Sequence, residues 1–393
     1  MHQEEKRMET KKKLNIMGFI SKYSLYIELV IVIAVFAVLT DGLFVSTRNL
    51  SNLMMQGVTC SIIAITMMSV IVSKNCDLSA GFGLGFMCTF AAKAMVDWNL
   101  SSGVTIILVL FVGLLIGLWH GFFIAYLHLP AFIVTLASQL LFQGLILVVG
   151  QGFSIGPAKE TFSIVGRDYV PGLGLAEGFN DTSAIIAAVL VLIYIVSSVL
   201  ARKRKIKEGC AVPPLQKEAA KWVGVSAIIL IVSAPMILYR GYPFAILFLA
   251  LCCLAMSYVI KNTPYGRYVF AIGGNPEAAK YSGINIEKNV MLIYIIHSMV
   301  LAVASIVYLG RVGQASASSG TGFEFTAITG CVVGGTSILG GRGNVLGAII
   351  GTMLMAGLDN GMSLLNLGAA YQYLIKGLVL MFAIALDVLG KKN

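Results

Sequence analysis

The sequence predicts an all-α, polytopic integral membrane protein: a bundle of about 10–12 transmembrane helices in two pseudo-repeated halves, with some broken or re-entrant segments. The first observation behind this fold class is composition, because 58% of the 393 residues are hydrophobic and only 12% are charged. Soluble domains are about 45–50% apolar and about 25% charged. Too few polar groups remain to cover a water-facing surface, so lipid must solvate most of the chain.

The second observation is a series of twelve apolar segments. A membrane helix needs roughly 20 apolar residues, and fewer where it is broken or buried in protein. The segments cover residues 23–45, 54–73, 79–96, 104–127, 131–150, 182–200, 222–240, 243–260, 289–309, 323–339, 345–362 and 370–388. The second, third and tenth are short or interrupted by glycine, which leaves the count between ten and twelve.

The third observation is the placement of positive charge. Nineteen of the 28 Lys and Arg residues lie in the N-terminal tail, in a central segment, around loop 261–288 and at the C-terminal end. With twelve spans all four places fall on one side, and the excess of positive charge on untranslocated loops makes that side cytoplasmic. We therefore expect a multi-pass protein of the plasma or inner membrane with cytoplasmic N- and C-termini.

The same map divides the chain into parts. We expect a basic cytoplasmic tail at 1–22, a first transmembrane half at 23–200, a cytoplasmic linker at 201–221, and a second half at 222–390 that includes a cytoplasmic loop at 261–288. The linker is flexible in this interpretation, and its basic side chains also suit a tether near anionic lipid.

Glycines at every fourth position give a weak internal echo. They are Gly113, Gly117 and Gly121 in one half and Gly343, Gly347 and Gly351 in the other. This spacing lets two helix backbones approach closely. The echo fits repeated halves, although glycine triplets are also common in membrane helices.

Several kinds of site are missing from the sequence. There is no Gly-x-x-x-x-Gly-Lys-Ser/Thr loop for nucleotide phosphates, no His-Glu-x-x-His and no Gly-x-Ser-x-Gly. The four histidines are scattered and the seven cysteines form no Cys-x-x-Cys. We therefore expect no catalytic residue, metal or cofactor on this chain. The positive charge lies in loops rather than on one folded face, which argues against nucleic acid as a partner.

Four ionisable residues lie at apparent membrane depth: Asp77, Glu324, Asp359 and Lys376. Such groups are costly in lipid and normally face a bundle interior or a cavity. The alternative is a helix-end residue that reaches the interface. Asp77 follows Lys74 and Asn75, so a position at the membrane surface is open for it.

A short polar loop between long apolar segments contains Asn275, Pro276, Glu277, Ala278, Ala279 and Gly283. Pro276 presets a helix start, Asn275 is a candidate N-cap, and Glu277 lies in the favourable first turn. The pattern predicts a short helix with a small-residue surface, or else an ordinary amphipathic turn. Glu-Ala-Ala with Gly four residues after the second Ala resembles the coupling loop of ABC importer permeases, which docks on a separate ATPase subunit.

Two further segments resemble sugar ABC permeases of the ribose/xylose type. Asp77-Leu78-Ser79-Ala80-Gly81 is similar to the Asp-Leu-Ser-Val-Gly signature of that family, with Ala80 in place of Val. Residues 129–137, which include Pro130 and Thr135, are similar to its Pro-Ala-Phe-Ile-Val-Thr-Leu element. The resemblance implies that Asp77, Ser79, Gly81, Pro130 and Thr135 belong to the pathway or its frame. Thr135 equally suits a bond to its own backbone.

The last segment of this kind is rich in glycine. Gly334, Gly335, Ser337, Gly340 and Gly341 fit the family's Gly-Gly-x-Ser-x-x-Gly-Gly-x-Gly element. Each interior Gly costs a helix about 1 kcal/mol, so the segment is not a regular helix. Irregular backbone at membrane depth must be buried in protein or line water. We expect a break or re-entrant turn near the pathway, or a tight cytoplasmic turn at Arg342.

The chain therefore resembles the permease of a monosaccharide ABC importer, nearest the xylose or multiple-monosaccharide group. The resemblance implies a pair of permease copies in a homodimer, a partner ATPase subunit that carries ATP and Mg²⁺, an extracytoplasmic sugar-binding protein, and surrounding membrane lipid. The substrate would be of the xylose, arabinose, galactose or glucose class. The alternative is an ion-coupled secondary transporter of small polar solutes, with Asp77, Glu324 and Asp359 as its coupling groups.

Overall fold

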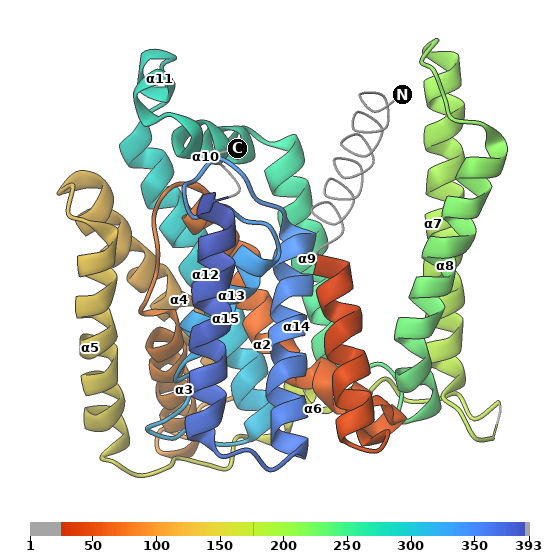
Figure 1. Cartoon of the computed structure of the whole chain (residues 1–393). Coiled ribbons are helices and arrows are strands. Elements are labelled where there is room, and N and C mark those ends of the chain that lie inside the picture. The colour runs from red at the N-terminus through yellow and green to blue at the C-terminus, as the bar shows by residue number, and fades with distance from the viewer. Residues whose placement is uncertain (1–24, 176, 390–393) are drawn as a thin grey trace, which may run out of the picture.

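The protein is a bundle of helices (Figure 1), and the computed structural model describes residues 25–175 and 177–389. Eight helices in this part of the chain are long and apolar enough to cross a membrane. They are α2 (Thr47–Val72), α4 (Ser102–Gly121, continued by the π-helical turn η2, Phe122–Tyr126), α5 (Ala131–Gly150), α7 (Asp181–Lys207), α8 (Leu215–Leu238), α9 (Phe244–Asn262), α12 (Ile286–Val312) and α14 (Val345–Leu364). The predicted polytopic all-α bundle is confirmed.

Other apolar helices complete the set of spans. They are the Leu25–Leu39 helix, α3 (Ala80–Val96), α13 (Phe323–Val333) and α15 (Ala369–Leu389). The remaining helices are η1 (Leu43–Val45), α6 (Glu160–Arg167), α10 (Pro264–Gly274) and α11 (Pro276–Tyr281). Helix α13 ends at Val333, six residues before the end of the expected 323–339 span, because the glycines that follow turn the chain.

Polar side chains cap many of the helix starts. Ser46, Ser101, Asn180, Asn275, Asn285 and Asn344 each accept a hydrogen bond from a backbone N–H in the first turn of the helix that follows. These first N–H groups have no partner within the helix. The caps therefore set where each helix begins.

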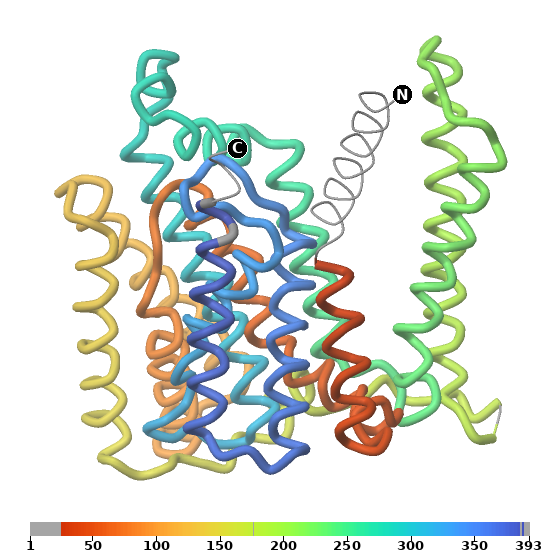
Figure 2. Tube along the Cα trace, viewed as in Figure 1, coloured from red at the N-terminus to blue at the C-terminus, as the bar shows by residue number. Residues whose placement is uncertain are grey.

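Two four-helix units, α2–α5 and α12–α15, form the centre of the molecule and have inverted topology. In Figure 2 the chain runs upward in α2 and downward in α12, and the same reversal holds for each following helix. The contacts match as well: α4 packs on α12 as α14 packs on α2, and α3 packs on α12 as α13 packs on α2. Inverted repeats of this kind are a common transporter architecture.

Both glycine triplets lie at close helix contacts. A Cβ on Gly117 would lie 2.6 Å from the Ile295 Cα of α12, and a Cβ on Gly347 would collide with the Gly334 carbonyl oxygen at the end of α13. The triplets therefore serve the same physical purpose, the close approach of two backbones. They do so against different partners, since α4 approaches α12 whereas α14 approaches α13.

The α7–α8 hairpin stands apart from the central units (Figure 1). Its helices pack on each other, and α8 also packs on α2. Both helices extend into the segment expected to be a linker, so only residues 208–214 lie outside a helix there.

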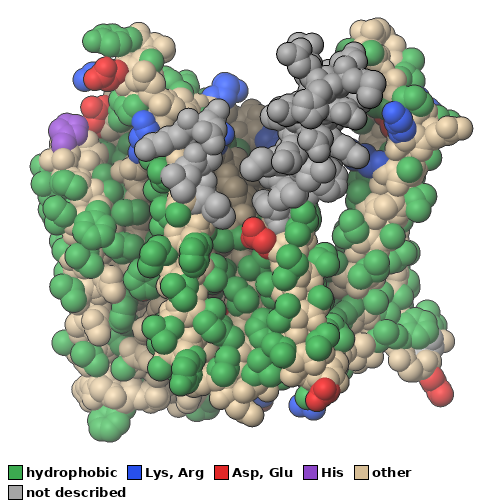
Figure 3. All heavy atoms as spheres, in the orientation of Figure 1, with side chains coloured by type: hydrophobic (Ala, Val, Ile, Leu, Met, Phe, Trp, Pro, Cys, Tyr) green, Lys and Arg blue, Asp and Glu red, His purple; other side chains and the backbone are tan. Residues whose placement is uncertain are grey.

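The described basic loops gather at one end of the bundle. Helices α10 and α11 and the 208–214 turn lie along the upper edge of Figure 1, and Figure 3 shows Lys and Arg side chains concentrated there. We call this the α11 end. The expected basic tail at 1–22, together with Lys391 and Lys392, lies outside the described residues.

Candidate functional site

The chain breaks between α2 and α3 inside the protein. Residues 73–79 contain no helix, and the Asp77 side chain is fully buried. Its Oδ1 accepts hydrogen bonds from the Ser79 backbone N–H at 2.8 Å and from Ser79 Oγ at 2.6 Å. This local bonding stabilises the turn that starts α3. Asp77 is therefore enclosed by protein rather than exposed to solvent.

Two histidines lie beside Asp77. His297 Nε2 of α12 is 3.3 Å from Asp77 Oδ2, and its Nδ1 is 3.0 Å from Thr66 Oγ1 of α2. His120 Nε2 of α4 is 3.3 Å from Ser79 Oγ. The sequence pattern treated these histidines as scattered, which is wrong for this pair. Side chains from α2, α4 and α12 thus hold the broken segment in place.

The second unit has a matching break before α13. The segments Gly81-Phe82-Gly83-Leu84-Gly85-Phe86 and Gly320-Thr321-Gly322-Phe323-Glu324-Phe325 share Gly-x-Gly-x-x-Phe. They also meet in space, since a Cβ on Gly81 would collide with the Gly320 carbonyl oxygen and with the Glu324 carboxylate. The starts of two half-helices therefore meet backbone to backbone. Glycine is required there because no side chain fits between them.

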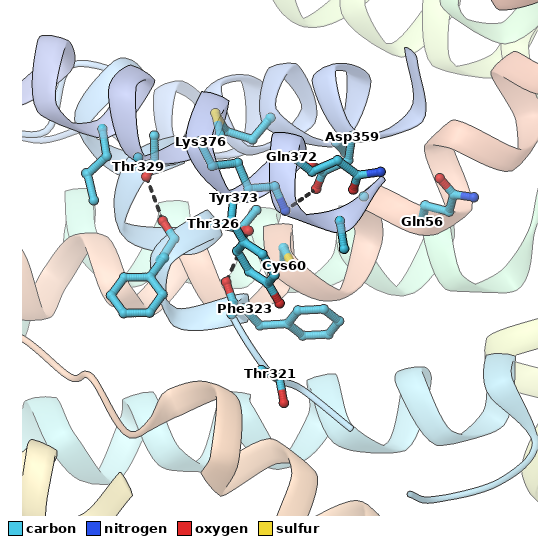
Figure 4. Close-up of a pocket in the computed structure, with 18 of the residues that line it drawn as sticks. Gln56, Cys60, Thr321, Phe323, Thr326, Thr329, Asp359, Gln372, Tyr373 and Lys376 are labelled. Atoms are coloured by element: carbon cyan, nitrogen blue, oxygen red, sulfur yellow. Dashed lines mark hydrogen bonds and ion pairs between the residues drawn. The ribbon is translucent and has the colours of Figure 1, made fainter. Parts of the chain in front are cut away.

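A cavity of about 510 Å³ lies beside this second break. It is bordered by α2, the end of α12, α13, α14 and α15 (Figure 4). Its polar lining comprises Gln56, Cys60, Arg311, Thr321, Thr326, Thr329, Asp359, Gln372, Tyr373 and Lys376. The volume is within the range of small-molecule sites. Most of this lining comes from the helix ends opposite the α11 end.

An ion pair crosses the cavity wall. Lys376 Nζ of α15 is 2.8 Å from Asp359 Oδ2 of α14, and the two side chains are 25% and 31% exposed. Asp359 Oδ1 and Arg311 Nε are shielded from solvent and find no hydrogen-bond partner among the described residues. Buried polar atoms are costly when unpaired. The accessible polar groups of the cavity are therefore the Asp359–Lys376 pair and the hydroxyl and amide side chains of its lining.

At the α11 end, a short helix projects beyond the bundle (Figure 1). Asn275 caps α11 by accepting from the Ala278 backbone N–H at 3.1 Å, and Pro276 occupies its first turn. The chain leaves α11 through Gly283, whose φ of 81° favours glycine. Tyr281 is 91% exposed. This arrangement presents a short, exposed helix that packs mainly on α10 and α12 among the described elements.

Helix α10 connects α11 to the first break. A Cβ on Gly273 would collide with the Val72 carbonyl oxygen, which also accepts a hydrogen bond from the Gly341 N–H at 2.9 Å. Val72 is the last residue of α2 and directly precedes the segment that carries Asp77. Helix α10 and the turn before α14 therefore both contact the backbone at the residue where α2 ends.

The other predicted site residues lie away from the cavity. Pro130 precedes α5, and Thr135 Oγ1 donates to the Ala131 carbonyl at 2.9 Å, the local bond considered for it. Gly334, Gly335, Gly340 and Gly341 shape the turn between α13 and α14, where Ser337 Oγ donates to Asp387 at 2.9 Å. None of these residues lines the cavity.

Sequence reasoning named Asp359 and Lys376 only as separate ionisable groups. The rest of the cavity lining was missed because its residues come from distant parts of the chain. The shared Gly-x-Gly-x-x-Phe pattern was the one signal that could have directed attention to the second break.

Comparison with known proteins decides the family. The family described as branched-chain amino acid transport system / permease component matches residues 49–384. The chain belongs to this permease family. The permease is thus a multi-pass membrane transport subunit and not an enzyme.

Named relatives of the permease handle sugars. It is 36% identical to the xylose transport system permease protein XylH of Haemophilus influenzae, over 94% of this chain and 97% of that protein. XylH of Escherichia coli is 35% identical, over 97% and 94%. The galactose/methyl galactoside import permease protein MglC of Escherichia coli is 28% identical, over 97% and 98%. No solved structure matches the permease. The resemblance to sugar ABC permeases is confirmed.

Proposed function

We propose that the permease forms the membrane path of an ATP-driven importer for a monosaccharide of the xylose, arabinose, galactose or glucose class. The observation that carries this proposal is similarity along nearly the full length of two xylose permeases. The cavity suits such a solute, because sugar hydroxyls both donate and accept hydrogen bonds and the lining offers amides, hydroxyls and an ion pair. The exposed faces of Phe325 and Tyr373 suit the C–H faces of a sugar ring.

In this proposal the α11 end is cytoplasmic and receives an ATPase subunit that binds ATP and Mg²⁺. Asn275, Pro276, Glu277, Ala278, Ala279 and Gly283 form the coupling element. ATP-dependent movement would pass from α11 through the Gly273–Val72 contact to the broken segment at Asp77. An extracytoplasmic sugar-binding protein would deliver the solute at the opposite end, and a second copy of the permease would complete a homodimer.

Co-purification tests the coupling element. The detergent-solubilised permease is isolated from its host beside a variant with Glu277→Arg and Gly283→Trp. Both substitutions fall on exposed positions, and because the φ of 81° at Gly283 makes Trp there strained, the two forms are compared at equal amounts of folded permease. We expect an ATPase to accompany the wild type and to be lost from the variant. Recovery of the ATPase with both forms would reject α11 as its docking element.

An ion-coupled secondary transporter is the second candidate, because Asp77 and Glu324 are buried carboxylates and Asp359 lies in the cavity wall. Such a protein would move sugar into liposomes along an H⁺ or Na⁺ gradient without any partner. Uptake by the permease alone under those conditions would favour this candidate. Uptake that requires the ATPase and ATP would exclude it.

A further inference from the structure

The α7–α8 hairpin contains a second, smaller cleft at the α11 end. It has a volume of about 160 Å³ and lies between the last turns of α7 and the first turns of α8. Its lining consists of Tyr194, Ser198, Ala201, Arg202 and Lys205 from α7 and Glu218, Lys221 and Trp222 from α8. No part of the proposed sugar path includes this cleft.

The cleft has an excess of positive charge. Arg202 is neutralised by its ion pair with Glu218 and also donates to the Pro213 carbonyl at 2.9 Å. Lys205 and Lys221 are exposed and form no ion pair or hydrogen bond with the described residues. The Arg202–Glu218 pair therefore holds the two helices together, while two ammonium groups remain free for an anion.

An apolar surface lies next to this charge. Val196 and Leu200 of α7 and Val223 of α8 are 47%, 60% and 70% exposed. Few residues in the apolar stretch of either helix are buried in the protein. Trp222 directly follows Lys221 at the start of the apolar stretch of α8, the position that aromatic side chains favour at a membrane surface. A ligand that fits both regions has an anionic head and hydrocarbon tails.

We propose that this cleft binds the phosphate group of an anionic phospholipid in the leaflet at the α11 end. Lys205 and Lys221 supply the charge, Ser198 and Trp222 supply neutral donors, and the acyl chains lie along the exposed apolar residues. A free phosphate ion would use the charged part and leave the apolar part unused. Because the hairpin packs on the central bundle mainly through α8 and α2, a bound lipid would hold its outer end at the membrane surface.

Native mass spectrometry of the detergent-purified full chain tests this proposal. The wild type is titrated with phosphatidylglycerol, and in parallel with phosphatidylcholine, whose headgroup has no net charge. The test variant carries Lys205→Gln and Lys221→Gln. The matched control carries Lys203→Gln and Lys207→Gln, which remove the same charge from the same end of the hairpin but lie outside the cleft.

We expect the test variant to bind phosphatidylglycerol on the order of tenfold more weakly, since each basic residue near an anionic lipid surface contributes several-fold in affinity. The control should stay within about twofold of the wild type, and phosphatidylcholine should bind all three proteins alike. An equal loss in the control would show diffuse surface charge and overturn the proposal. Displacement of the lipid by excess inorganic phosphate would identify a free-phosphate site and would also overturn it.

Discussion

The two inverted units contain the same helix break but surround it with different chemistry. In the first unit, α5 closes on α3, where Phe86 and Phe142 stack with ring centroids 6.1 Å apart. In the second unit, α15 packs less extensively on α13 than α5 does on α3, and the cavity of about 510 Å³ lies between α13, α14 and α15. Phe325, the counterpart of Phe86, is 47% exposed and lines that cavity.

The different packing around the two helix breaks suggests that the two units have different functions. The first break is sealed, and its carboxylate is matched by Ser79 and His297. It is also the break that α10 contacts through Val72. The second break borders a cavity whose wall carries an ion pair, amides and hydroxyls. We infer that the first unit transmits movement and that the second unit holds the solute.

The largest expected effect is a loss of stability on removal of the Asp77 carboxylate, compared with removal of the Asp359 carboxylate. Asp77→Ala should lower the free energy of unfolding by about 3–5 kcal/mol, because it leaves Ser79 and His297 buried without the charged group that they contact. Asp359→Ala should cost less than about 1 kcal/mol, since its ion pair with Lys376 is partly exposed. Thermal denaturation in detergent compares the two variants. Equal losses would contradict the distinction between a sealed break and an open cavity.

A smaller loss of stability is expected at the contact between the start of α3 and the segment that precedes α13. Gly81→Ala should destabilise the protein by about 1–3 kcal/mol, because the added Cβ overlaps the Gly320 backbone and overpacking costs that much. Gly144→Ala in α5 is the matched control, since its Cβ meets nothing within 4 Å. The control should be neutral or slightly stabilising. Thermal stability measured for both variants decides this, and an unaffected Gly81→Ala would disprove the close approach.

The sequence was sufficient to predict the helices that the lipid environment requires. Long apolar runs must form helices in lipid because their backbone groups have no other partner, and so the candidate spans matched observed helices. The cap at Asn275 and the short helix α11 followed from local rules. Glycine spacing suggested repeated halves, but it did not indicate that the two units are inverted.

The sequence did not predict which side chains from distant parts of the chain meet in the folded protein. His120 and His297 come from different units, and no local pattern shows that they meet at Asp77. The cavity accompanies the looser packing of α15 on α13, a packing outcome that apolar composition does not specify. Thr135 and Ser337 were recognised as parts of motifs, yet their observed bonds are structural.

A transport effect without a stability effect is expected at the cavity ion pair. Asp359→Asn should reduce sugar uptake on the order of tenfold, because it leaves Lys376 as an uncompensated charge in the cavity wall. The exchange of Asp359→Lys with Lys376→Asp should recover part of the uptake. Uptake is measured in proteoliposomes with the partner subunits present. Wild-type uptake by Asp359→Asn would remove this pair from the path.

The most direct test of the central claim uses Cys60, a thiol that lines the cavity. The purified permease is treated with N-ethylmaleimide until mass spectrometry shows that Cys60, which is 7% exposed, is alkylated. It is then reconstituted with the proposed ATPase and binding protein, and ATP-driven uptake of the proposed sugar is measured. Cys210, which is exposed on the hairpin turn, is the internal control. The account predicts that alkylation blocks uptake in the wild type and in Cys210→Ser but not in Cys60→Ser. Full uptake by a permease shown to be alkylated at Cys60 would contradict a sugar path through this cavity.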